Sequence, residues 1–218
     1  MQLITQSDLV TKLILLILLI LSIVAWTLFI YKLAIGYVKR RHVNAALQAL
    51  KSTHTVDEIS SVAAHHAHTV PGVLIARNLS ILRMILDRRQ TITPLTEREM
   101  QMLESGLEQT ISEAMQGEES FLPFFAATAA VSPLLGLFGT VWGLIHAFIR
   151  ISEKQQADIP TVAPGIAEAL ITTLAGLMVA IPALLMFHYL STRARAYEQQ
   201  LLAIGDKLLW SCTMLFLN

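Results

Sequence analysis

The most constraining feature of the chain is a set of three long stretches that almost lack formal charge. Residues 13–31 and 120–149 contain no Asp, Glu, Lys or Arg, and residues 159–192 contain only Glu168. At about 1.5 Å per residue, the first stretch matches the roughly 30 Å hydrocarbon core of a bilayer, and the other two exceed it. We therefore expect three membrane-spanning helices, of which the second and third extend into the cytoplasm.

The composition agrees with an all-α integral membrane protein. Of the 218 residues, 54% are hydrophobic and 15% are charged, and no strand-like alternation of useful length is present. A net charge of zero implies no general attraction to nucleic acid. The sequence contains no phosphate-binding glycine loop, no nucleophile and base at a suggestive spacing, and no cysteine-histidine framework. It therefore predicts no enzyme activity, no cofactor and no metal site, and residues 65–68 (His-His-Ala-His) are better explained as an exposed loop.

The distribution of Lys and Arg predicts the orientation. Nine of them lie within residues 36–118 and three follow residue 192, whereas the opposite side has Lys12, Lys154 and the boundary residue Arg150. The positive-inside rule then places the N-terminus outside and the C-terminus in the cytoplasm. The expected segments are an external N-terminus (1–12), transmembrane helix 1 (13–35), a cytoplasmic helical insertion (36–119), transmembrane helix 2 (120–150), an external loop (151–162), transmembrane helix 3 (163–191) and a cytoplasmic C-terminal helix (192–218).

Within the insertion, helical structure is expected at residues 43–64 and 96–115. The second segment is amphipathic, because Met100, Leu103, Leu107 and Ile111 recur at helical spacing. We expect this segment to run into the second span as one long helix. Its apolar stripe would pack on neighbouring helices or on another copy of the chain.

Two basic clusters lie close to the membrane in this scheme. They are residues 39–41 (Lys-Arg-Arg) and the pair Arg88 and Arg89. Each either touches anionic lipid headgroups or forms an ordinary solvated face.

Small residues recur along one side of the second and third spans. The repeated positions are Ala126, Ala129, Pro133, Gly136, Thr140, Gly143 and Ala147, and then Gly165, Ala169, Thr172, Gly176, Ala180 and Ala183. Small residues allow close approach of helices in a membrane, and Gly139 with Gly143 adds a GxxxG pair. The two spans are predicted to pack as an antiparallel hairpin, or to leave a narrow lumen when several copies form a ring. The candidate packing residues are Gly136, Gly139, Gly143, Gly165 and Gly176.

Polar groups on these helices are the candidates for an ion pathway. A charge at bilayer depth costs about 2.5–3.5 kcal/mol, so Glu168 indicates a site where a cation moves or a charged helix docks. The alternative is a protonated carboxyl that only holds helices together. Thr172 lies about 40° around the helix from Glu168, and Thr173 about 140°. Thr140 either bonds a carbonyl of its own helix or serves a neighbour.

Residues 136–143 (Gly-Leu-Phe-Gly-Thr-Val-Trp-Gly) and 162–171 (Val-Ala-Pro-Gly-Ile-Ala-Glu-Ala-Leu-Ile) closely resemble the TolQ/ExbB branch of the MotA/TolQ/ExbB proton-channel family. The resemblance implies a homopentamer in the bacterial inner membrane, with a periplasmic N-terminus and a pore lined by spans two and three. The pore would hold two copies of an ExbD- or TolR-like partner, each with one transmembrane Asp. Proton flow would drive relative rotation, which is passed to a TonB- or TolA-like protein in the periplasm.

In this family, Thr140 and Glu168 match pore-lining positions and Thr173 matches the polar threonine of span three. Position 172 is alanine in many relatives, so the doubled threonine leaves open which hydroxyl faces the pore. The expected function is that of a proton-channel stator subunit that uses the proton motive force for work at the outer membrane. The alternative is a non-conducting structural scaffold. The chain could be of the ExbB type or the TolQ type, the sequence does not fix the stoichiometry of the partner, and it is compatible with coupling to protons or to sodium ions.

Overall fold

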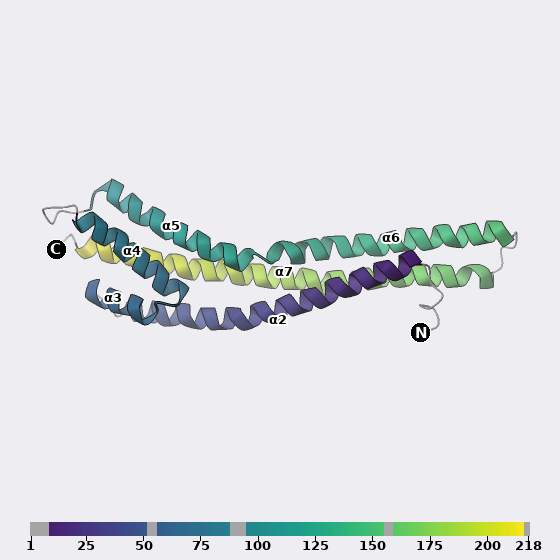
Figure 1. Cartoon of the computed structure of the whole chain (residues 1–218), viewed down its shortest axis with the longest axis horizontal. Coiled ribbons are helices and arrows are strands. Elements are labelled where there is room, and N and C mark those ends of the chain that lie inside the picture. Colours follow the sequence, from purple (N-terminus) through teal and green to yellow (C-terminus); the bar gives the residue numbers. More distant parts are fainter. Residues whose placement is uncertain (1–8, 52–55, 88–94, 155–158, 216–218) are drawn as a thin grey trace. The chain divides into compact units, whose positions relative to one another are not determined.

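The computed structural model describes residues 9–51, 56–87, 95–154 and 159–215. Within these ranges the chain is helical and contains no strand (Figure 1). The helices are α2 (Leu9–Lys51), α3 (Val56–His65), α4 (Val70–Asp87), α5 (Glu97–Glu119), α6 (Leu122–Lys154) and α7 (Ile159–Leu215). Three stretches of the described helices are long and apolar enough to cross a membrane. The predicted all-α membrane fold is therefore confirmed.

The chain divides into two compact units. The first contains Met1–Tyr31 and Phe121–Leu190, and the second contains Lys32–Ser120 and Ser191–Asn218. Helices α2 and α7 each contribute to both units. Helix α6 belongs to the first unit, and α3, α4 and α5 belong to the second.

The first unit has an apolar exterior. Its buried cluster is formed by Ala25, Phe125 and Met186, one from each of its three helices. Large apolar side chains on the same helices are exposed, including Leu19, Leu134 and Leu185. Such an exterior suits helices that are surrounded by lipid or by other apolar helices, not by water.

The second unit is a helical bundle with its own hydrophobic core. That core includes Leu50 of α2, Ile59 of α3, Leu74 of α4, Leu107 of α5 and Leu201 of α7. The apolar stripe expected on α5 is buried here at Leu107 and Ile111, while its Leu103 joins a smaller cluster with Leu82 and Ile85 of α4. The stripe therefore packs within the chain.

The expectation of one long helix from residue 96 into the second span is wrong. Helix α5 ends at Glu119 and α6 begins at Leu122. Pro123 explains the break, because it has no N–H to donate to the carbonyl of Glu119. A proline is tolerated in the first turn of a helix, which is where α6 places it. The hydroxyl of Ser120 instead donates to the carbonyl of Gly117 at 3.1 Å.

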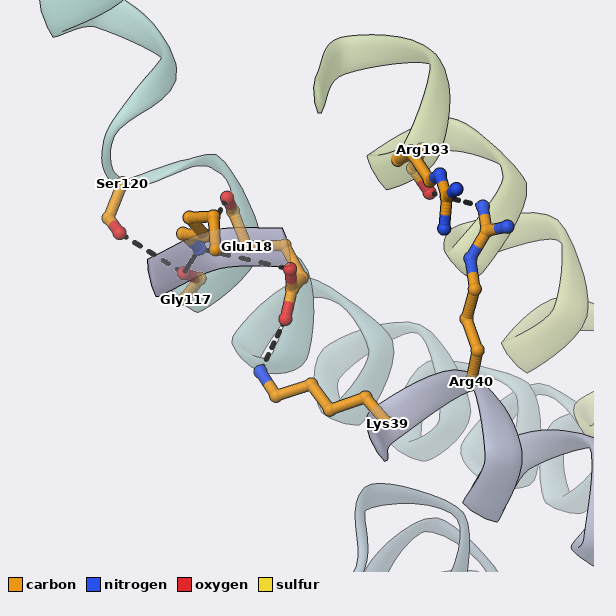
Figure 2. A network of polar contacts seen from close by, with 7 residues as sticks. Lys39, Arg40, Gly117, Glu118, Ser120 and Arg193 are labelled. Carbon is orange, nitrogen blue, oxygen red and sulfur yellow. Dashed lines mark hydrogen bonds and ion pairs between the residues drawn. The ribbon is translucent and has the colours of Figure 1, made fainter. Parts of the chain in front are cut away.

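Basic side chains of α2 form hydrogen bonds and an ion pair with the last turn of α5 (Figure 2). Lys32 Nζ donates to the carbonyls of Gly117 at 3.0 Å and Glu118 at 2.9 Å, and Lys39 pairs with the Glu118 carboxylate. A cation at the C-terminus of a helix also interacts favourably with the helix dipole. Arg40 donates to the Arg193 carbonyl at 3.4 Å.

Of the basic cluster at residues 39–41, Lys39 and Arg40 are thus engaged within the second unit, and Arg41 is exposed. Lipid contact by Lys39 or Arg40 would compete with these bonds. The pair Arg88 and Arg89, the first eight residues and residues 155–158 of the predicted external loop lie outside the described residues.

Candidate functional site

Helices α6 and α7 approach closely through their glycines. A Cβ atom added at Gly136 would lie 2.9 Å from the carbonyl oxygen of Thr172, and one at Gly176 would lie 2.6 Å from the carbonyl oxygen of Ser132. One at Gly143 would lie 2.9 Å from the Cβ of Ala169. Since these distances are shorter than side chains tolerate, the helix pair requires glycine at these positions.

The face of α7 in this contact coincides with the small-residue stripe identified in the sequence. Its buried members are Ala169, Thr172, Gly176, Ala180 and Ala183. On α6 the contact face differs from the predicted stripe in the first half of the helix. Thr128 and Ser132 are buried there, whereas Ala129 and Pro133 are only half-buried. Small half-buried positions therefore remain on α6 beside the hairpin contact.

The two adjacent threonines of α7 converge on one carbonyl of α6. Thr172 is fully buried, and its hydroxyl lies 2.7 Å from the carbonyl of Ala169 and 3.3 Å from that of Gly136. Thr173 is half-buried and donates to the same Gly136 carbonyl at 3.1 Å. Thr173 is therefore the more accessible of the two hydroxyls within a single subunit.

Thr140 lies one turn after Gly136 on α6, but its hydroxyl bonds within its own helix. It donates to the carbonyl of Leu137 at 2.7 Å, and the residue is half-buried. This is the local bond that helical threonines commonly make. The hydroxyl oxygen keeps lone pairs that can accept a further hydrogen bond.

Glu168 lies one turn before Thr172 on α7, next to Ala169. Because Ala169 packs against Gly143, the carboxyl-bearing residue borders the hairpin contact at that level. Glu168 is itself half-buried. A carboxyl in this position lies beside the glycine contact without being enclosed by it.

Two buried hydroxyls of α6 were not singled out from the sequence. Thr128 and Ser132 of α6 are buried, and neither hydroxyl has a hydrogen-bond partner among the residues that the structure describes. The available signal was their spacing, because 128, 132 and 136 recur every four residues and so share a face.

No group of three His, Cys, Asp or Glu side chains in the described parts of the chain is arranged to hold a metal ion. His65 ends α3, and its ring meets that of His66 edge-on at 5.2 Å. Partial burial lowers the pKa of His66, and the neighbouring His65 and His42 add to this effect. These histidines belong to the second unit, apart from the α6–α7 hairpin.

The α6–α7 hairpin thus combines closely packed glycine faces, threonine hydroxyls and a carboxyl within an apolar span, and an ionisable group in such a span is a candidate functional site. Residues 69–202 match the model of the "MotA/TolQ/ExbB proton channel family", which covers more than half of the chain. The chain therefore belongs to the MotA/TolQ/ExbB proton channel family.

Individual relatives come from both halves of the TolQ/ExbB branch. The chain is 56% identical over 81 residues to the Tol-Pal system protein TolQ of Haemophilus influenzae, a match that covers 37% of this chain and 36% of TolQ. It is 30% identical over 195 residues to the biopolymer transport protein ExbB of Pseudomonas putida, covering 89% of this chain and 57% of that protein. It is 30% identical over 197 residues to ExbB of Salmonella typhimurium, covering 90% and 79%.

The chain spans about a third of the TolQ relative and little more than half of the P. putida ExbB. The higher identity is with TolQ, whereas the longer matches are with ExbB. The matches to both proteins confirm the predicted TolQ/ExbB branch.

Proposed function

We propose that this chain is the proton-conducting stator subunit of an energy-transducing complex in the bacterial inner membrane. It uses the proton motive force, together with an ExbD- or TolR-like partner, to drive TonB- or TolA-type work at the outer membrane. The observation that carries this proposal is the hydroxyl-bearing α6–α7 hairpin, bordered by Glu168, within the region that matches the proton channel family.

In the proposed arrangement the N-terminus is periplasmic and the C-terminus is cytoplasmic. The excess of Lys and Arg in residues 36–118 and after residue 192 supports this orientation. The bundle of the second unit, which contains most of these residues, then lies in the cytoplasm.

Five copies are proposed to form a ring in which α6 and α7 line a pore for two partner helices, each with a transmembrane Asp. The exposed apolar side chains of the first unit suit contact with lipid and with neighbouring copies. The half-buried small positions on α6, among them Ala129, Pro133 and Thr140, suit the close approach of another helix.

We assign different roles to the two adjacent threonines. Thr173 lines the pore, because it is half-buried and can still exchange its bond to Gly136 for one to a partner carboxylate or water. Thr172 holds α7 against α6, because it is fully buried and lies within bonding distance of two carbonyls. Thr140 and Glu168 complete the polar wall along which the proton moves.

A non-conducting scaffold is the second candidate, and one observation favours it. The hydroxyls of Thr140, Thr172 and Thr173 all bond carbonyls of this chain, as purely structural threonines do. A scaffold needs the glycine contact but not an ionisable Glu168. It therefore tolerates Glu168→Gln and fails when a large side chain replaces Gly136.

The two candidates are distinguished by Glu168→Gln and Thr140→Ala in cells that depend on this complex. The stator proposal expects loss of proton-gradient-dependent uptake or envelope integrity, with the complex assembled at normal levels. Thr27→Ala is the matched control, because Thr27 is exposed on α2 and only bonds the Ile23 carbonyl of its own helix. Full activity of both test variants at normal protein levels contradicts the proposal.

A further inference from the structure

Two buried hydroxyls of α6 lack the bonds that other threonines of the chain make. Thr128 is 2% exposed and Ser132 is 0% exposed, and neither hydroxyl has a partner among the described residues. By contrast, Thr27, Thr140 and Thr172 each bond a carbonyl of their own helix. A hydroxyl enclosed in a membrane protein without a partner is unfavourable, so these two indicate a missing ligand.

A third polar group of the same turn also lacks its usual partner. Pro133 has no N–H, so it cannot donate the helical hydrogen bond to the carbonyl of Ala129. That carbonyl lies in sequence between Thr128 and Ser132. Three polar groups within five residues thus require bonds that helix α6 does not supply. In membrane helices such groups are satisfied by neighbouring side chains or by ordered water.

The spacing of these groups favours water. Residues four apart on a helix are separated by about 6 Å along its axis. Hydrogen-bonded oxygens lie only about 2.8 Å apart, so hydroxyls at this spacing do not bond each other directly, whereas a chain of two water molecules spans the gap. The next residue at this spacing is Gly136, whose carbonyl accepts from Thr173.

We infer that Thr128, Ser132 and the Ala129 carbonyl hold water within the α6–α7 hairpin of each subunit. We further infer that this water extends the proton path from Thr173 towards the start of α6. This second part rests on the proposed stator function. The route runs inside the subunit, along the buried face of α6 that includes Ser132 and Gly136.

Proton movement along a row of hydroxyls and water molecules needs no additional carboxylate. Each water accepts one proton on an oxygen lone pair and releases another to the next group, so one O–H bond forms as one breaks. A Ser or Thr hydroxyl can do the same, because it has one proton to donate and lone pairs to accept. Every group returns to neutrality after the proton has passed.

The water site is tested first by stability, with Ser132→Ala and Thr128→Val in the full-length protein and Thr27→Val as control. If the hydroxyls bond water, each change removes hydrogen bonds and lowers the thermal midpoint by about 2–4 °C. If they are enclosed in a dry contact, the change removes an unfavourable buried group and leaves the midpoint unchanged or raises it. An unchanged or raised midpoint for both variants overturns the inference.

The pathway is tested by proton flux into vesicles that contain the complex of this chain with its single-span partner. Thr128→Val combined with Ser132→Ala is expected to lower the flux about tenfold, which corresponds to the loss of one hydrogen bond in the rate-limiting step. Thr27→Val should leave it unchanged. Wild-type flux in the double variant overturns the pathway but not the stator proposal. Absence of flux in the wild type overturns the stator proposal, and the stability test still decides the water site.

Discussion

At Gly139, the lack of a side chain allows α6 to lie directly against Thr172. A Cβ atom there would overlap the Thr172 side chain, which is fully buried and has no room to move. Gly139→Val is therefore expected to lower the free energy of unfolding by about 1–3 kcal/mol through overpacking. Thermal unfolding of the purified protein in detergent measures this change.

Gly117 provides the matched control for Gly139. It also lies within a helix, but a Cβ atom there would meet nothing within 4 Å. Gly117→Ala is expected to be neutral or stabilising, because alanine favours the helix. Equal stability of the wild type and Gly139→Val would contradict the close contact between α6 and α7.

Burial of Tyr197 is expected to make the stability of the second unit depend on pH. Its hydroxyl is buried without a partner among the described residues, and burial, with Glu118 as the smaller cause, raises the pKa of Tyr197 to about 12. An unfolded tyrosine ionises near pH 10, so between about pH 10 and 12 the unfolded chain binds fewer protons than the folded one. The free energy of unfolding should therefore fall as the pH rises through this range.

The variant Tyr197→Phe tests this dependence. It is expected to flatten the fall of the thermal midpoint between pH 9 and about 11.5, because phenylalanine has no proton to lose. At neutral pH it should be neutral or stabilising, since it removes an unpartnered hydroxyl. Tyr37→Phe, at an exposed position on α2, should leave the pH profile as in the wild type. Identical profiles for Tyr197→Phe and wild type would refute the assignment.

Among the elements, the long helices could be predicted from the sequence, whereas the short helices could be predicted only in part. Uncharged runs identify the spans because lipid excludes charge over a fixed length. Helix α4 was not singled out, because Pro71 and Gly72 resemble loop signals, although proline is favoured in the first turn of a helix. The break between α5 and α6 lies at Pro123, one of only two interruptions, with Gly117, of a pattern that otherwise favours a continuous helix.

The parts of the candidate site that depend only on residue type and spacing could be predicted from the sequence. Glycines and hydroxyls at helical spacing are unusual in an apolar run, so Gly136, Gly139 and Thr172 were identifiable. The exact contact face of α6 was not, because small residues occur on more than one side of that helix. Ser132 was missed because the partners of a hydroxyl depend on packing, which the sequence does not give.

The bonds of Lys32 at the C-terminal end of α5 are expected to stabilise the fold. Lys32 bonds two carbonyls there and lies 3.8 Å from the Glu118 carboxylate, with the side chains only 10% and 15% exposed. Lys32→Met should lower the free energy of unfolding by about 1–3 kcal/mol, because it leaves carbonyls and part of a charge unsatisfied. Arg77→Met, which breaks the more exposed pair with Glu113, should cost about 1 kcal/mol or less. Equal effects in thermal unfolding would contradict a structural role for Lys32.

At the scale of the whole molecule, the two units differ in the character of their surfaces and in the residues they contain. The first has an apolar exterior and contains the hydroxyls and Glu168, whereas the second has its own core and most of the basic residues. Helices α2 and α7 contribute to both units without interruption. In the proposed stator, these continuous helices pass a movement generated in the membrane to the second unit.

The most direct test of the central claim is proton flux through the reconstituted complex. The chain and its single-span partner are placed in vesicles with an imposed pH gradient and membrane potential, and a pH-sensitive dye inside reports the flux. We predict flux in the wild type, a loss of most of it in Glu168→Gln, and the same flux in sodium-free and sodium-containing buffer. The proposed proton-conducting function would be contradicted if the Glu168→Gln variant conducted as well as the wild type. It would also be contradicted if the correctly assembled wild type showed no flux.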